Sequence, residues 1–147
     1  VFALLTWFVL FMTYFIISGQ PWENSLLLYM LNSLVFTFTS LTLSFLIGTL
    51  LKSRNAISAV SNIVALGPSF ISGVFVPQEL LGQSVLNIAK ATPTYWYVTS
   101  NNAIASLTGV ASVNLSTIYL NMAIVAMFGI GFLIISSYTG RRQQVKS

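Results

Sequence analysis

Cysteine and histidine are both absent from this sequence, and charged residues are scarce. Without cysteine the chain forms no disulfide and offers no thiolate metal site, and without histidine it has no imidazole base or proton relay. Two acidic residues in total are too few for chemistry that depends on paired carboxylates. Charged residues make up 5% of the chain, whereas a soluble domain carries about 25%. These absences exclude most catalytic and metal-site classes and predict an integral membrane protein.

Long hydrophobic runs stand in place of the missing charge, since 56% of the residues are hydrophobic. A membrane-spanning helix needs about 20 apolar residues. Four segments approach that length and predict spans at about 1–18, 25–51, 55–76 and 116–138. Buried helices of a soluble protein are the alternative, but these segments would lack the charged face that such helices present to water. The expected fold class is therefore an all-α integral membrane protein with one transmembrane domain over residues 1–147.

The positions of the basic residues predict the orientation of the spans. Lys52 and Arg54 lie between the second and third spans, and Arg141, Arg142 and Lys146 follow the fourth. With four spans these two places fall on one side of the membrane, which the positive-inside rule makes cytoplasmic. Residues 139–147 then form a cytoplasmic tail of a multi-pass plasma-membrane protein. The basic residues form no stripe, so no nucleic-acid partner is expected.

Residues 77–115, between the last two spans, are too polar for a span and too apolar for an ordinary loop. Pro77 suits the first position of a helix, and that helix is expected to end at Pro93, because the residue before a proline disfavours the α conformation. Tyr95 and Trp96 are residue types that settle at headgroup depth. A second helix-compatible run extends to Leu107. The segment predicts a pair of short re-entrant or interfacial helices on the outer side, forming either a static cap or a gate.

Polar side chains within the second and third spans have two interpretations. Small hydroxyls and amides recur there at helical spacing, at Asn32, Ser33, Thr37, Ser40, Asn62 and Ser69. Such residues let helices pack closely and hydrogen-bond to one another. They also suit the lining of a polar route for a substrate. The two asparagines are the strongest candidates for such a route, because hydroxyl packing alone does not require a costly buried amide.

Three glycines and a proline predict local features of the last two spans. Gly67 and Pro68 should kink the third span or interrupt its hydrogen bonds, either as a static bend or as a hinge. Gly129 and Gly131 offer a close-packing surface in the fourth span. No Asp, Glu, Lys, Arg or His lies within a predicted span, which argues against an ion-coupled secondary carrier.

The order of these features resembles the ABC-2 type permeases, the membrane subunits of a class of ATP-binding-cassette exporters. The resemblance runs over about residues 39–142: a span, the basic turn KSRNAISA, a span ending in SGVFVP, the amphipathic stretch QELLGQSVLNIAKATP, then TYW and a last span ending in RR. Its most specific parts are residues 72–77 and 91–96. Gly82 and Gln83 stand where a second proline is frequent in the family, which is a departure from the pattern.

The resemblance implies an architecture and a set of partners. A full permease of this family has six spans, so this chain, which begins at Val1 within an apolar run and without an initiator methionine, is expected to be the C-terminal part of a longer protein. Two permeases dimerise, and each docks on a cytoplasmic ATP-binding subunit. ATP and Mg²⁺ would then bind to that partner, and this chain would carry no cofactor and no enzymatic activity. Lys52 and Arg54 are either contacts to the ATPase or simple topology signals.

The resemblance also implies a function for the outer segment, as a gate near the exit of the pathway. Its residues would be Ser72, Gly73, Pro77, Pro93, Tyr95 and Trp96. The expected function is ATP-driven export of a drug, lipid, peptide or polysaccharide through a dimeric permease embedded in the lipid bilayer. Two other classes stay open: a non-transporting anchoring or assembly subunit, and a secondary carrier.

Overall fold

The computed structural model describes residues 2–18, 24–107 and 114–144. Within these ranges every regular element is a helix, which confirms the expected all-α class for this part of the chain. The other residues, which include Glu23 and Lys146, lie outside the described ranges. The elements are α1 (Phe2–Ser18), α2 (Asn24–Leu50), α3 (Arg54–Ser72), the 3₁₀ helix η1 (Gln78–Leu80), α4 (Gln83–Ala89), α5 (Pro93–Ser106) and α6 (Leu115–Gln144).

Three of these helices are long and apolar enough to cross a membrane, judged by length and composition. They cover Ser25–Leu50, Arg54–Ser72 and Leu115–Arg141. Helix α1 is apolar as well, but its 17 residues fall short of the roughly 20 that a span needs. The first of the four expected spans is therefore not confirmed. The expected last span is longer than predicted, because α6 continues as a helix to Gln144 instead of ending near residue 138.

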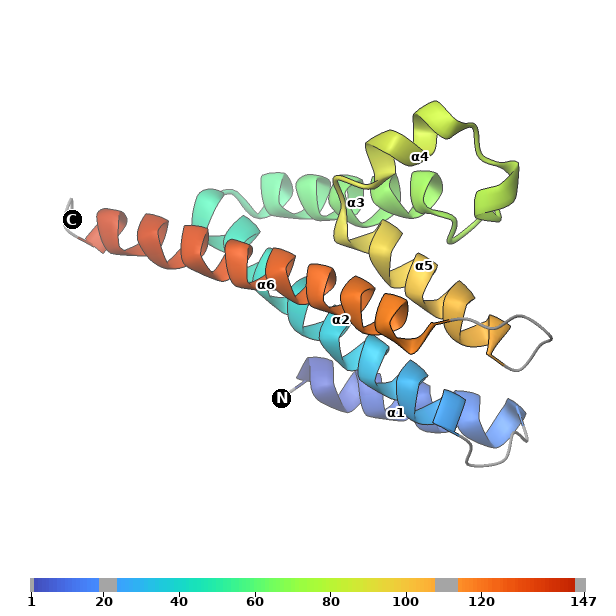
Figure 1. The fold of residues 1–147 in the computed structure, drawn as a ribbon. Coiled ribbons are helices and arrows are strands. Elements are labelled where there is room, and N and C mark those ends of the chain that lie inside the picture. The colour runs from blue at the N-terminus through green and yellow to red at the C-terminus, as the bar shows by residue number, and fades with distance from the viewer. Residues whose placement is uncertain (1, 19–23, 108–113, 145–147) are drawn as a thin grey trace.

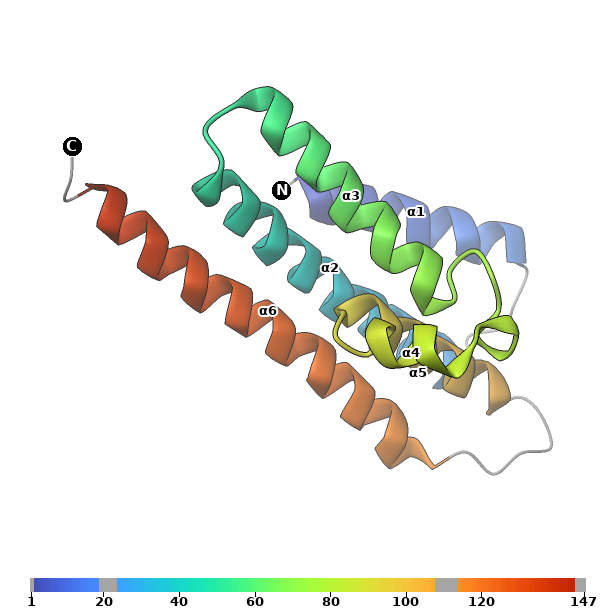
Figure 2. The same cartoon turned by 90° about the horizontal axis from the view of Figure 1, so that it is seen from above.

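Helices α2 and α6 run side by side in the same direction and share the most extensive contact between two helices (Figures 1 and 2). Thr39 Oγ1 donates a hydrogen bond to the Val125 carbonyl at 2.9 Å, and further along the hydroxyls of Thr49 and Ser136 lie 3.3 Å apart. Helix α5 packs against both α2 and α6, and α1 lies against α2. The core where α2, α5 and α6 meet is built from Leu28, Ile104, Ile118 and Met122.

Helix α3 ends earlier than the sequence predicts, at Ser72 instead of about Val76. Gly73 terminates it in the left-handed region, at φ 101°, a conformation that L side chains rarely adopt. The Val74 amide then donates back to the Ser69 carbonyl at 3.3 Å. Pro68 does not end the helix, which continues through it for another turn. Because proline has no N–H, α3 lacks one backbone hydrogen bond at this position.

The segment between α3 and α6 forms a helical hairpin, in which α4 runs back along α3 and α5 returns beside α2 and α6 (Figure 1). The expected single helix from Pro77 to Pro93 is wrong. Pro77 precedes the short η1, α4 covers only seven residues, and Pro93 begins α5 instead of ending the helix before it. Thr92 is extended at φ −115° and ψ 145°, as the residue before a proline prefers. The proline thus serves at the first position of α5.

Candidate functional site

The end of α3 is tied to the tip of the hairpin by two buried or half-buried hydroxyls. Ser72 is fully buried, and its Oγ lies 3.3 Å from Thr92 Oγ1. Thr92 Oγ1 donates its one proton to the Ala89 carbonyl at 2.7 Å, so Ser72 must donate to Thr92. Pro93 follows directly as the first residue of α5. The predicted gate residue Ser72 therefore contacts the residue that precedes Pro93, another predicted gate residue, although the two are far apart in the chain.

Gln78 fastens the connection between α3 and α4 onto α5. Its side-chain amide donates to the Ser72 carbonyl at 2.8 Å and to Thr99 Oγ1 at 3.2 Å. The side chain passes so close to Gly73 that a Cβ there would lie 2.5 Å from Gln78 Cγ. Sequence reasoning missed Gln78, because its partners are known only once α5 is placed. The predicted gate residue Pro77 lies next to this contact and is exposed.

The aromatic residues predicted at the outer turn lie at the start of α5. Tyr95 and Trp96 meet edge to face, with ring centroids 5.3 Å apart. Trp96 Nε1 donates to the Lys90 carbonyl at 2.9 Å. That carbonyl lies in the turn between α4 and α5, where it accepts no hydrogen bond within a helix. The indole N–H therefore pairs a backbone acceptor that the end of α4 leaves without a helical partner. Both side chains are half-buried.

Asn32 holds α5 against α2. Its side-chain amide donates to the Tyr97 carbonyl at 3.1 Å and to Asn101 Oδ1 at 2.8 Å, and the residue is fully buried. Tyr29 adds a hydrogen bond from its hydroxyl to the Asn101 carbonyl at 3.3 Å, and the rings of Phe36 and Tyr97 stack at 4.3 Å. The amide that the sequence marked as a candidate for a polar route thus lies within a helix contact.

Replacing Asn32 with leucine is expected to loosen the hairpin. The substitution removes both donated hydrogen bonds at similar volume and leaves Asn101 Oδ1 without its donor, at a cost of about 1–2 kcal/mol in a membrane. Protease accessibility of α5 and the thermal unfolding midpoint of the purified protein measure the effect. Asn55→Leu is the matched control, because Asn55 is exposed in the first turn of α3 and surface changes stay within about 0.5 kcal/mol. Equal effects of the two substitutions would contradict this role.

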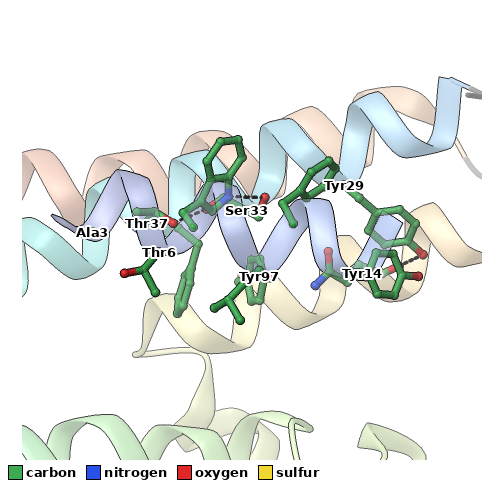
Figure 3. Close-up of a pocket in the computed structure, with 12 residues that line it drawn as sticks. Ala3, Thr6, Tyr14, Tyr29, Ser33, Thr37 and Tyr97 are labelled. Carbon is green, nitrogen blue, oxygen red and sulfur yellow. Dashed lines mark hydrogen bonds between the residues drawn. The ribbon is translucent and has the colours of Figure 1, made fainter. Parts of the chain in front are cut away.

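A cavity of about 710 Å³ lies between α1, α2 and α5. Figure 3 shows side chains from all three helices around it, with Ala3 and Thr6 near one end and Tyr14 and Tyr29 near the other. Two of the predicted pathway residues, Ser33 and Thr37, line this cavity. None of its lining residues is charged. Its aromatic lining residues are Trp7, Phe11, Tyr14, Tyr29, Phe36 and Tyr97.

The aromatic walls of this cavity were missed in the sequence, although a signal was present. Trp7, Phe11 and Tyr14 recur at i, i+4 and i+7, as do Tyr29, Ser33 and Phe36, so each set falls on one helical face. The Trp7 indole donates to Ser33 Oγ at 2.9 Å and so joins the two faces.

A second cavity, of about 260 Å³, lies on another side of α2, between α2, α3 and the start of α5. Ser40 and Ser69, both predicted pathway residues, line it together with Pro93. Asn62 lines neither cavity and is exposed on α3. The six predicted pathway residues are therefore divided among two cavities, one helix contact and one exposed helix face.

Lys52 and Arg54 are exposed at the connection between α2 and α3. That connection and the last turns of α6 lie at the same end of the molecule (Figure 1). The hairpin connection between α3 and α4 lies toward the opposite end (Figure 1). Within the described residues, no group of three or more His, Cys, Asp or Glu side chains is placed to hold a metal ion.

Comparison with known proteins assigns the family. A sequence model described as ABC-2 type transporter matches residues 1–105. This match starts earlier than the resemblance expected from about Thr39, since it includes α1, and it reaches through most of α5. No curated protein and no solved structure matches the chain. We conclude that the chain belongs to the ABC-2 type transporter family, as a multi-pass, permease-type membrane component of transport that is not itself catalytic.

Proposed function

We propose that the chain is the membrane-spanning permease subunit of an ATP-driven exporter and that it forms the translocation pathway with a second copy. The hairpin of α4 and α5 carries this proposal. It lies almost wholly within the matched family segment and is joined to the end of α3 by the side chains of Ser72, Gln78 and Thr92. A hairpin that a few side-chain hydrogen bonds hold against its neighbours can open and close at one end of a bundle when those bonds break and form.

The outer gate is proposed to comprise Ser72, Gly73, Pro77, Pro93, Tyr95 and Trp96. Turns at membrane depth are tolerated only where protein or water satisfies their backbone groups. Gln78 and Trp96 do so for two of the carbonyls in this region. Each hydrogen bond that fastens the hairpin contributes about 0.5–1.5 kcal/mol net, so a few of them break at a cost that partner-driven switching can supply. Gly67 and Pro68, where α3 lacks one hydrogen bond, are the proposed hinge.

The pathway is proposed to use the polar faces beside α2. Ser33 and Thr37 line the larger cavity, and Ser40 and Ser69 line the smaller one. Asn62, exposed on α3, is proposed to face the pathway or the second copy, because an amide turned to lipid hydrocarbon would be costly. Asn32 is proposed to act indirectly, by holding α5 in place.

The ATPase is proposed to dock at the end of the molecule that carries Lys52 and Arg54, with ATP and Mg²⁺ bound by that partner. This end, with the C-terminus, would face the cytoplasm of a cell whose plasma membrane holds the protein. We expect the full-length protein to co-purify with an ATP-binding subunit and to stimulate ATP turnover. A purified, export-competent protein without any ATPase partner would contradict the proposal.

Replacing both Lys52 and Arg54 with glutamine tests whether these residues contact the ATPase or only set the orientation of the protein in the membrane. Exposed ion pairs are worth about 0.2–1 kcal/mol each, so the loss of two is expected to weaken ATPase binding by up to about 30-fold and to lower stimulated ATP turnover. Orientation, mapped by labelling single cysteines introduced into the α2–α3 connection and the C-terminal end, should stay unchanged. If part of the protein became inverted while the correctly oriented molecules kept normal ATPase affinity, these residues would serve only as topology signals.

A further inference from the structure

We propose that the cavity between α1, α2 and α5 binds one flat aromatic molecule that carries a delocalised positive charge. Its volume of about 710 Å³ lies within the range of roughly 300–1,000 Å³ that small-molecule sites occupy. The binding of this molecule does not depend on the proposed function. The further statement that it is the exported cargo does rest on that function.

The aromatic side chains give the cavity electron-rich surfaces. Rings from all three helices take part, and two of them, Phe36 and Tyr97, are already stacked on one another at 4.3 Å across the contact between α2 and α5. On α1, Trp7 and Phe11 stack at 5.7 Å. The face of an aromatic ring carries partial negative charge, so it attracts both flat rings and cations. Tryptophan and tyrosine, which are present here, attract cations more strongly than aliphatic side chains do.

Three hydroxyl groups in the wall of the cavity present lone pairs and not protons. Ser33 donates to the Met30 carbonyl at 2.9 Å, Thr37 donates to the Ser33 carbonyl at 2.8 Å, and Tyr29 donates to the Asn101 carbonyl at 3.3 Å. A hydroxyl has one proton, so these three can only accept hydrogen bonds from a ligand. Together with the ring faces they favour a ligand with N–H groups or positive charge.

The absence of charge in the lining decides which kind of cation fits. No carboxylate is among the lining residues, so a compact ammonium ion would lose its hydration without an ion-pair partner. A charge spread over a large ring system loses less hydration and gains contact with the aromatic faces. An anion would meet ring faces and these oxygen lone pairs, and the Asn101 side-chain amide in the lining is a neutral donor that cannot balance its charge.

Two xanthene dyes on the same ring system test this selectivity. Tetramethylrosamine is a delocalised cation and fluorescein is an anion. With the full-length complex in phosphatidylcholine nanodiscs and without ATP, fluorescence anisotropy should show tetramethylrosamine binding at least about tenfold more tightly, since the ring faces attract cations and about 1.4 kcal/mol corresponds to a factor of ten. Equal affinities would overturn the proposal.

Variants locate the site. Tyr97→Leu and Trp7→Leu should each weaken tetramethylrosamine binding by about tenfold, while Tyr119→Leu, on an exposed α6 side chain outside the cavity, should not. Thr37→Val keeps the shape of the wall and removes an acceptor, so it should weaken binding without a change in thermal unfolding. Unchanged affinity in Tyr97→Leu and Thr37→Val would overturn the proposal, even if Trp7→Leu failed to fold.

A membrane lipid is the competing occupant. Phosphatidylcholine with brominated acyl chains quenches tryptophan fluorescence on contact. If comparison with a Trp7→Phe variant shows that these chains quench Trp7, one of the three tryptophans, and tetramethylrosamine does not relieve the quenching, the cavity is an acyl-chain site and the proposal is wrong. Because binding is measured without ATP, the two proposals fail in different ways. If the complex turns over ATP but does not bind tetramethylrosamine, only the proposed ligand is wrong. If the protein binds the dye but has no ATPase partner, only the proposed export function is wrong.

Discussion

Valine in place of Gly73 is expected to abolish the fastening of the hairpin and to lower export by about tenfold or more. Gly73 has a φ of 101°, and a side chain in a left-handed conformation costs about 1–2 kcal/mol. Its Cβ would also lie 2.5 Å from Gln78 Cγ and 3.3 Å from Val98 Cγ1. A shift of about 1.4 kcal/mol changes an equilibrium tenfold, so the two penalties together displace the closed hairpin. Export in cells and protease accessibility of residues 78–92 measure the loss.

Two further variants separate backbone strain from general sensitivity of this connection. Gly82→Ala is the matched control, because Gly82 has an ordinary φ of −62° and a Cβ there would meet nothing within 4 Å. Gly73→Ala combined with Gln78→Ala relieves the closest contact but keeps the left-handed backbone, so it should recover export only in part. If Gly73→Val and Gly82→Ala behaved alike, the conformation of Gly73 would not matter to the gate.

Pro93 illustrates why the outer segment was only partly predictable. A proline is compatible with both the end of one helix and the first position of the next, and local rules do not choose between them. In the structure the choice is fixed by side chains around the turn: Ser72, 20 residues away in the chain, bonds to Thr92, and the Trp96 indole bonds to the carbonyl of Lys90. The existence of two short helices followed from the sequence, but their boundaries depended on contacts that only the folded chain makes.

The aromatic cavity shows a second limit. Helical spacing predicts that Trp7, Phe11 and Tyr14 share one face, but it does not say which other face they meet. Asn32 was correctly marked as an unusual residue for an apolar span, yet its partners Tyr97 and Asn101 lie 65 and 69 residues away in the chain. Periodicity therefore identifies faces and outliers, whereas the pairing of faces is a property of the tertiary fold.

Alanine in place of Gly129 is expected to separate α2 from α6 and to destabilise the protein by about 1–3 kcal/mol, the usual cost of overpacking. Gly129 is buried, and a Cβ there would lie 2.9 Å from Thr39 Oγ1 and 3.0 Å from Phe38 Cε1. Phe38 is partly exposed and can turn away. Thr39 is held, because its hydroxyl lies 2.9 Å from the Val125 carbonyl and 3.1 Å from the Val35 carbonyl, so the strain falls on the backbones of α2 and α6.

Gly131→Ala, on the same helix, is the control for Gly129→Ala. Residues two apart on an α-helix differ by about 200° around its axis, so Gly129 and Gly131 point to nearly opposite sides. The sequence predicted a close-packing surface for both, but a Cβ at Gly131 would meet nothing within 4 Å. Alanine there should leave the thermal unfolding midpoint unchanged or raise it slightly, because alanine favours a helix over glycine by about 1 kcal/mol. Were Gly131→Ala the more damaging of the two, the packing of α6 on α2 through Gly129 would be wrong.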